Sequence, residues 1–205
     1  MDAHQWDARY AAAAASGIWA HAAPRIVQEV VATLPPGRAL DLGCGDGRTT
    51  RLLAARGWTV TAVDFSAEAL AIAVRVTTEA ADRVTWLQAD VTTLAPRAGQ
   101  HLVVATYLHL PEPALRRVLA TAAASLVPGG TLLVLGHDVE NLATGAPGPT
   151  DPSLLYTPEL LAGAVGGLEV VRCERVRRGP DDAETHGPVS GGEAVDTVLV
   201  ATAPA

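Results

Sequence analysis

Carboxylates and glycines gather in one short stretch of the chain, Asp41-Leu-Gly-Cys-Gly-Asp-Gly47. An apolar run precedes the three alternate glycines, and a helical pattern begins near Asp46. A strand, a tight turn and a helix start in this order often form a site for a nucleotide-like ligand in α/β proteins. Glycine suits the turn because its backbone needs positive φ and because a ligand must approach it closely.

The spacing of these glycines indicates which ligand the turn holds. A dinucleotide-binding turn has the pattern Gly-x-Gly-x-x-Gly, and its last glycine would fall on Arg48. Asp41 and Asp46 flank the turn, where they would repel a pyrophosphate and attract a cation. The pattern therefore favours a positively charged adenosyl ligand over NAD.

Two further carboxylates stand at the ends of the next predicted strands. Asp64 lies 21 residues after Gly43, close to the spacing at which an acidic residue reaches ribose hydroxyls. Asp90 ends the following strand, where it can accept a hydrogen bond from an adenine amino group while Val91 packs on the ring. The alternatives are a helix-capping role for Asp64 and a turn-forming role for Asp90.

Strands and helices alternate through most of the chain, which predicts a parallel sheet covered on both faces. The last third differs, with a long loop over 136–156, a helix starting after Thr157, and two final strands. These two strands should pair antiparallel, because no crossover helix fits between them. The predicted strands are 38–42, 58–63, 84–88, 102–106, 131–135, 168–176 and 194–201, and the earlier helices cover about 24–34, 46–56, 67–77 and 113–126.

In these motifs the chain resembles the class I S-adenosylmethionine-dependent methyltransferases over nearly its whole length. The stretch from Asp41 to Gly47 is similar to that family's first motif, and Val63-Asp-Phe-Ser66 is similar to its ribose-binding loop. Gln88-Ala-Asp-Val91 resembles the adenine-side loop, and Leu126-Val-Pro-Gly-Gly-Thr-Leu resembles the turn before the fifth strand. The start Trp6-Asp-x-Arg-Tyr10 is loosely similar to small-molecule methyltransferases of the tellurite-resistance and thiopurine type.

The resemblance implies an α/β fold with a Rossmann-like seven-stranded sheet in the order 3-2-1-4-5-7-6, only strand seven being antiparallel. We expect one domain over 1–205, with an N-terminal lid segment 1–23, a cofactor-binding core 24–136, and an acceptor loop and closing hairpin 137–205. The implied cofactor is S-adenosyl-L-methionine. Its expected contacts are Asp41, Gly43, Cys44 and Gly45 for the methionyl part, Asp64 for the ribose, Phe65, Asp90 and Val91 for the adenine, and Thr106 at the end of the fourth strand.

Methyl transfer from a sulfonium needs alignment and exclusion of water, while a general base is optional. Ligands of open α/β sheets lie where the strand order reverses, here between strands one and four. Tyr107 and His109 follow strand four, so we expect them near the methyl group, with His109 as the best candidate base. Alternatively, His109 caps the next helix or packs under the lid. His137 beside Asp138 is either an oriented base or half of a metal site, but no spacing of metal ligands supports a metal.

The acceptor pocket is expected to involve aromatic residues near the start of the chain and the long loop. The predicted contacts are Trp6, Tyr10, Trp19, Asn141 and Tyr156. The alternative for the N-terminal aromatics is that they anchor their helix to the main body.

Composition narrows the class of protein. The chain has 205 residues, of which 49% are hydrophobic and 18% charged, with a net charge of −7, which is typical of a globular domain. It has no basic stretch for nucleic acid, no apolar run long enough for a membrane span, and no signal peptide. We therefore predict a cytoplasmic monomer or homodimer that methylates a small molecule. The competing hypotheses are an NAD(P)-dependent oxidoreductase and a non-catalytic protein that binds S-adenosylmethionine.

Overall fold

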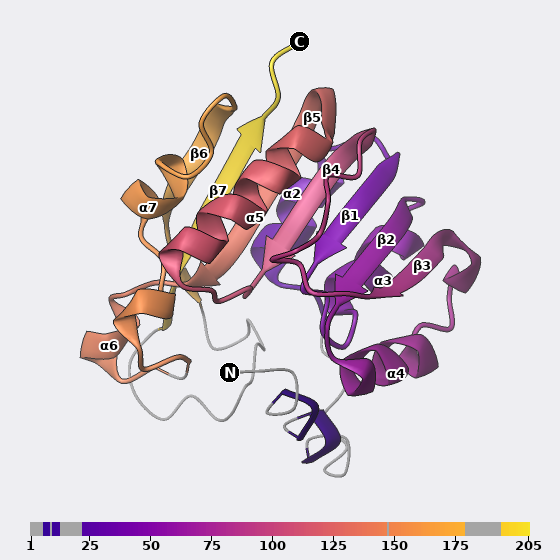
Figure 1. Cartoon of the computed structure of the whole chain (residues 1–205), viewed down its shortest axis with the longest axis horizontal. Coiled ribbons are helices and arrows are strands. Elements are labelled where there is room, and N and C mark those ends of the chain that lie inside the picture. Colours follow the sequence, from indigo (N-terminus) through magenta and orange to yellow (C-terminus); the bar gives the residue numbers. More distant parts are fainter. Residues whose placement is uncertain (1–5, 9, 13–21, 147, 179–193) are drawn as a thin grey trace. The chain divides into compact units, whose positions relative to one another are not determined.

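A computed structural model describes residues 6–8, 10–12, 22–146, 148–178 and 194–205 (Figure 1). The chain divides into two compact units, Met1–Leu94 and Ala95–Ala205. This division does not coincide with the predicted boundary after residue 136, and the single domain over 1–205 stays a prediction. None of the helices in the described ranges is both long and apolar enough to cross a bilayer.

The sheet has seven strands in the order β3-β2-β1-β4-β5-β7-β6, which confirms the order implied by the resemblance. β1 (Arg38–Leu42), β2 (Thr59–Asp64) and β3 (Val84–Gln88) pair parallel, as β4 (Gln100–Thr106) does with β5 (Leu126–His137). β7 (Ala194–Thr202) runs antiparallel to both β5 and β6 (Glu169–Arg178), so the predicted closing hairpin is also confirmed.

The first unit places three strand ends and the helices that follow them. Pro24 immediately precedes α2 (Arg25–Ala32), α3 (Arg48–Ala55) follows the glycine turn, and α4 (Ala67–Val76) follows β2. Ser66 caps α4 because its hydroxyl accepts a hydrogen bond from the Ala69 N–H at 3.1 Å, as predicted. The remaining described elements are the short η1 (Ala81–Arg83) and helical residues at 6–8 and 10–12.

The second unit packs α5 (Glu112–Ser125) on β4 and β5 (Figure 1). The segment predicted as a long loop contains α6 (Asn141–Thr144) and η2 (Pro152–Leu154), and a parallel bridge between Asp138 and Tyr156 closes it. α7 (Pro158–Ala162) begins at the predicted cap, where the Thr157 hydroxyl accepts from the Leu160 N–H at 3.1 Å. The bridge and the cap therefore hold the described residues between β5 and α7 in place.

β5 begins at Leu126, before the predicted start at Thr131, so the prediction of its start was wrong. Its register against β4 jumps from Gln100↔Leu126 to Leu102↔Thr131. The extra residues have a partner beyond β7, since the Gly129 N–H donates to the Ala203 carbonyl and the Ala203 N–H to the Gly130 carbonyl. A strand start that depends on a distant partner leaves no local pattern in the sequence.

Candidate functional site

The glycine turn adopts the backbone conformation expected of it. Gly43, Gly45 and Gly47 have φ values of 70°, 54° and 79°, a region that side chains with a Cβ rarely adopt. Gly47 is also required by packing, since an added Cβ would lie 2.8 Å from the Trp86 ring. The turn therefore needs glycine both for its conformation and for its contact with β3.

The Asp64 carboxylate fixes this turn to the end of β2. Its Oδ2 accepts a hydrogen bond from the Gly45 N–H at 2.8 Å, and its Oδ1 accepts from the Ser66 N–H at 2.9 Å. The Gly43 and Cys44 N–H groups both donate to the Val63 carbonyl. Burial raises the pKa of Asp64, while the hydrogen bonds that its carboxylate accepts from the Gly45 and Ser66 N–H groups lower this pKa. Each oxygen keeps a further lone pair, so Asp64 can order the turn and still accept from a ligand.

Asp41 has a buried carboxylate oxygen that lacks a protein partner. The side chain is 0% exposed, and its Oδ2 accepts a hydrogen bond from the Thr50 hydroxyl at 2.6 Å. Its Oδ1 is buried without a hydrogen-bond partner in the described part of the chain. Burial raises the pKa of Asp41 to about 7. A buried carboxylate with an unused oxygen is a site for a donor, and above all for a cation.

Tyr10 lies against the same turn. An added Cβ at Gly45 would stand 2.6 Å from the Tyr10 hydroxyl, and burial, followed by the Asp64 charge, raises the pKa of this phenol. Trp6 contacts the Tyr10 ring at 5.7 Å between centroids. The Asp7 carboxylate accepts from the Ser66 hydroxyl at 2.5 Å. This favours the anchoring alternative for these aromatics, while their contact with an acceptor stays a prediction.

The predicted adenine-side residues also lie in the first unit. Asp90 is exposed, and its Oδ1 accepts from the N–H and the hydroxyl of Thr92 at 2.8 Å and 2.7 Å. These contacts correspond to the turn-forming role that was the alternative to adenine binding by Asp90. Val91 is buried and Phe65 is partly exposed. Cys44 is a buried free thiol whose pKa is raised by burial, so it is poorly reactive.

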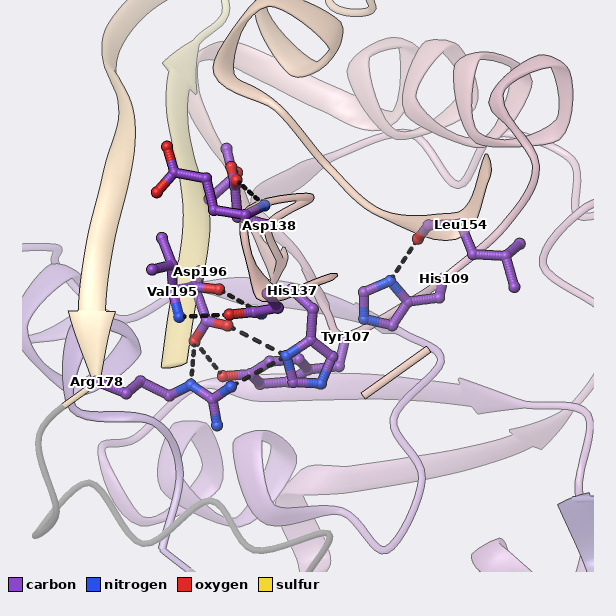
Figure 2. A network of polar contacts seen from close by, with 11 residues as sticks. Tyr107, His109, His137, Asp138, Leu154, Arg178, Val195 and Asp196 are labelled. Carbon is purple, nitrogen blue, oxygen red and sulfur yellow. Dashed lines mark hydrogen bonds and ion pairs between the residues drawn. The ribbon is translucent and has the colours of Figure 1, made fainter. Parts of the chain in front are cut away.

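A second group of polar and aromatic side chains lies in the second unit (Figure 2). It is formed by residues from four segments: Tyr107 and His109 after β4, His137 at the end of β5, Arg178 at the end of β6 and Asp196 in β7. We call these five residues the histidine cluster. They include all three predicted catalytic residues, Tyr107, His109 and His137, which the fold brings together.

Tyr107 is held in a strained conformation within the histidine cluster. Its φ of 56° is unusual for a residue with a side chain and costs about 1–2 kcal/mol. Its hydroxyl donates to Asp196 Oδ2 at 2.8 Å, and its ring lies 4.8 Å from the His137 ring. Because the phenolic proton is directed at a carboxylate, Tyr107 helps to order the cluster, and a role for it as a base is not supported.

His137 is paired with Asp196 and Arg178. Its Nδ1 lies 3.3 Å from Asp196 Oδ1 and 3.1 Å from Arg178 Nη2, and Arg178 Nε lies 2.9 Å from Asp196 Oδ2. His137 Nδ1 therefore faces both the guanidinium, which can only donate, and a carboxylate oxygen, which can only accept. The arginine and the aspartate balance each other's charge beside the ring.

The predicted pairing of His137 with its neighbour Asp138 was wrong. Asp138 accepts hydrogen bonds from the Arg175 side chain at 3.0 Å, the Glu140 N–H at 2.9 Å and the Thr197 hydroxyl at 2.5 Å. Consecutive side chains of a strand point to opposite faces, which separates the two residues. Among the residues that the structure describes, no group of three His, Cys, Asp or Glu side chains could hold a metal ion.

His109 has one ring nitrogen engaged and one without a partner. Nδ1 lies 2.7 Å from the Leu154 carbonyl oxygen, which can only accept, so Nδ1 carries the hydrogen of the neutral ring. Nε2 is buried and has no partner in the described ranges. Burial, and then the neighbouring His137, lowers the pKa of His109 to about 4. α5 has no side-chain cap, so the alternative in which His109 caps this helix was wrong.

Tyr156 and Asn141 make their polar contacts inside the protein. The Tyr156 hydroxyl donates to the Leu108 carbonyl, and its ring lies 5.2 Å from that of His109. The Asn141 carboxamide donates to the Val195 carbonyl at 2.7 Å and accepts from the Val195 N–H at 2.8 Å. These contacts hold the segment after β5 in place, so we do not include either residue in the proposed acceptor site. Trp19 lies outside the described residues.

Four residues that make hydrogen bonds or ion pairs near the glycine turn or in the histidine cluster were not proposed as site residues from the sequence. They are Asp7, Thr50, Arg178 and Asp196. Asp196 had a detectable signal, because it is the one charged residue in the apolar run Ala194–Thr202. A buried strand rarely carries a carboxylate unless that carboxylate is paired.

Comparisons with known proteins agree with this geometry. Residues 39–130 match the family described as "Methyltransferase domain". This stretch, somewhat less than half of the chain, is similar in sequence to methyltransferase domains. A ubiquinone biosynthesis O-methyltransferase of Nitrosomonas europaea is 31% identical over 108 residues, which are 51% of this chain and 45% of that protein. The chain thus spans about half the length of the curated relatives it matches.

Several solved structures share the fold of this chain. TehB from Haemophilus influenzae superposes with a TM-score of 0.69 at 16% identity, over 86% of this chain and 61% of its own. The N-methyltransferase NodS from Bradyrhizobium japonicum, in complex with S-adenosylhomocysteine, has a TM-score of 0.63 at 16% identity, over 85% of this chain and 82% of its own. At these identities the likeness concerns the fold alone.

Proposed function

We propose that this chain transfers the methyl group of S-adenosylmethionine to a small-molecule acceptor. The observation that carries the proposal is the buried Asp41, whose Oδ1 has no partner in the described residues and which lies beside a turn of three glycines at positive φ. An α-ammonium group satisfies such an oxygen, whereas the pyrophosphate of NAD(P) would meet a buried negative charge. The oxidoreductase hypothesis is therefore the weaker one.

The chemistry of the predicted residues is compatible with this cofactor. In the proposal, Asp41 binds the α-ammonium group, and the backbone of Gly43, Cys44 and Gly45 borders the methionyl part. Asp64 accepts from the ribose hydroxyls through its remaining lone pairs. The adenine would be held by Phe65, Asp90 and Val91. Thr106, buried at the end of β4, belongs to the second unit, and its contact with the cofactor stays a prediction.

The cofactor supplies an electrophilic methyl group, so the protein's part is to bind, orient and exclude water. Positioning of this kind can contribute roughly 7–11 kcal/mol to lowering the barrier. We propose that the histidine cluster of the second unit serves the acceptor, with His109 and His137 as the residues nearest the chemistry. The O-methyltransferase name of the relative from Nitrosomonas europaea supports a small organic acceptor.

Calorimetric titration of the full chain with S-adenosylhomocysteine, alongside NADH, tests the cofactor. We expect sub-millimolar binding of the former and none of the latter, and the reverse would refute the proposal. Asp90→Ala should weaken binding about 10–150-fold, since one hydrogen bond to a charged group contributes about 1.5–3 kcal/mol. Asp82→Ala removes an exposed carboxylate outside the proposed site and is the matched control. Release of S-adenosylhomocysteine only when an acceptor is present separates an enzyme from a non-catalytic binder.

A further inference from the structure

The histidine cluster contains a buried hydrogen-bond acceptor that the fold leaves unused. His109 Nδ1 donates to the Leu154 carbonyl at 2.7 Å, so the lone pair of the neutral ring is on Nε2 (Figure 2). Nε2 is shielded from solvent and has no hydrogen-bond partner in the described segments. Buried polar atoms are rarely left unpaired in native proteins, and an unpaired one at a candidate site indicates a missing ligand group. The missing group must be a donor.

The contacts that fix this tautomer are built into the fold. Asp151 caps η2 by accepting from the N–H and the hydroxyl of Ser153 at 2.9 Å and 2.8 Å, and Leu154 is the last residue of η2. Tyr156 binds the Leu108 carbonyl from the same segment. Two hydrogen bonds, through Leu154 and Tyr156, thus tie the residues after β4 to those after β5. The His109 ring is therefore held in one orientation.

The charges around His109 indicate which donor it meets. Its ring stacks on His137 at 5.0 Å between centroids, with 4° between the ring planes. Among the described residues, the charged groups facing this pair are Arg178 and Asp196. They form an ion pair whose charges cancel, although Asp196 Oδ1 has no hydrogen-bond partner there. The phenols of Tyr107 and Tyr156 both donate within the protein. A desolvated site without excess negative charge disfavours an ammonium group, and the Nε2 lone pair repels a carboxylate. An uncharged hydroxyl meets neither penalty.

We propose that His109 Nε2 is the general base for an uncharged hydroxyl acceptor, a phenol, enol or alcohol, and that the methylation is therefore on oxygen. The inference rests on the proposed function. The acceptor oxygen forms a bond to the methyl carbon while the carbon–sulfur bond breaks and its electron pair goes to sulfur. The hydroxyl proton goes to His109 Nε2, which leaves a methyl ether, a neutral thioether and an imidazolium that returns its proton to water. His137 is a positioning residue, since it contacts the His109 ring face.

Nitrogen NMR of the full chain labelled with ¹⁵N-histidine tests the tautomer without turnover. His109→Asn identifies the resonance, and its amide can still donate to the Leu154 carbonyl, so the loop contact is kept. We expect a neutral ring with hydrogen on Nδ1 from pH 8 down to about pH 5. A ring with hydrogen on Nε2, or one protonated at pH 7, would overturn the inference.

Three probes of similar size distinguish the acceptor class: phenol, benzoate and benzylamine. We expect phenol alone to shift the His109 Nε2 resonance, and His109→Asn to reduce methyl transfer to phenol by about 10²–10⁴-fold, typical for loss of a general base. S-adenosylhomocysteine should bind this variant as it binds the natural chain. A shift produced only by benzoate or benzylamine, or by none of the three, contradicts the acceptor class. If S-adenosylhomocysteine does not bind the natural chain, the proposed function fails independently of the tautomer.

Discussion

Asp41→Asn should make the protein more stable and at the same time weaken its binding of the cofactor. The Asp41 carboxyl is fully buried, and burial raises its pKa from 3.8 to about 7. A carboxyl with a raised folded-state pKa keeps its proton in the folded protein where the unfolded chain has lost it. Its ionisation therefore costs folding free energy as the pH rises from about 4 to about 7, and the cost is constant above that range.

The magnitude follows from those two values. Each pH unit between them contributes about 1.4 kcal/mol, so the ionised Asp41 lowers the free energy of unfolding by about 4 kcal/mol at pH 8. The introduced asparagine can still accept from the Thr50 hydroxyl, but its NH₂ group is a buried donor without a partner, which costs about 1–3 kcal/mol. The variant should therefore be about 1–3 kcal/mol more stable at pH 8, and about 0.5–2.5 kcal/mol less stable at pH 4, where Asp41 costs little and the NH₂ cost remains.

Urea unfolding of both proteins at intervals from pH 4 to pH 9 measures this difference. A difference that stays constant across the range would refute the account of Asp41. The same unfolding experiment is then repeated with S-adenosylhomocysteine at 100 times its Kd for the natural chain. The ligand should raise the free energy of unfolding of the natural chain by about 2.7 kcal/mol and that of the variant by less. Asp46→Asn, which removes another carboxylate from the same turn, is the control for loss of charge alone.

Two further substitutions test other contacts of the structure. Gly45→Ala strains a residue with φ of 54° and displaces the Tyr10 hydroxyl, whereas Gly129→Ala, at φ of 74°, meets nothing within 4 Å. Unfolding should show a loss of about 1–2 kcal/mol for the backbone in both and a larger total loss for the first, and equal losses would contradict the Tyr10 contact. Asn141→Leu leaves the Val195 N–H and carbonyl unpaired and should cost about 2–5 kcal/mol in urea unfolding, while a loss below about 1 kcal/mol would contradict its structural role.

The fold could be predicted where the sequence carries local signals. β1 and β3 have the predicted bounds, since turn residues end the helix before β1, Gly43 follows β1 directly, and Asp90 follows β3 closely. The caps Ser66 and Thr157 were predictable for the same reason, because a capping hydroxyl acts within three residues. The start of β5 was not predictable, since its hydrogen-bond partner Ala203 lies at the other end of the unit's sequence.

In the candidate site, too, only the contacts between segments with a local sequence signal could be predicted. The glycine turn and Asp64 are neighbours through adjacent parallel strands, so spacing alone was enough to associate them. Arg178 and Asp196 belong to a hairpin whose register no local pattern determines, and the partner of His137 was consequently assigned to Asp138. The hydrogen bond from His109 to the Leu154 carbonyl depends on the path of a whole segment after β5, which sequence spacing does not encode.

The two units differ in whether their buried carboxylates are paired with an arginine, and this difference predicts which ligands each unit binds. In the first unit one oxygen of the Asp41 carboxylate accepts from Thr50 and the other has no hydrogen-bond partner among the described residues, so its buried negative charge is only partly compensated. In the second unit Asp196 Oδ1 likewise has no hydrogen-bond partner among the described residues, but the charge of Asp196 is balanced by Arg178, and that of Asp138 by Arg175. A poorly compensated buried carboxylate is stabilised by a bound cation, whereas a balanced pair offers a charged ligand no net attraction to offset its desolvation. We therefore expect the charged ligand at the glycine turn and a neutral acceptor at the histidine cluster.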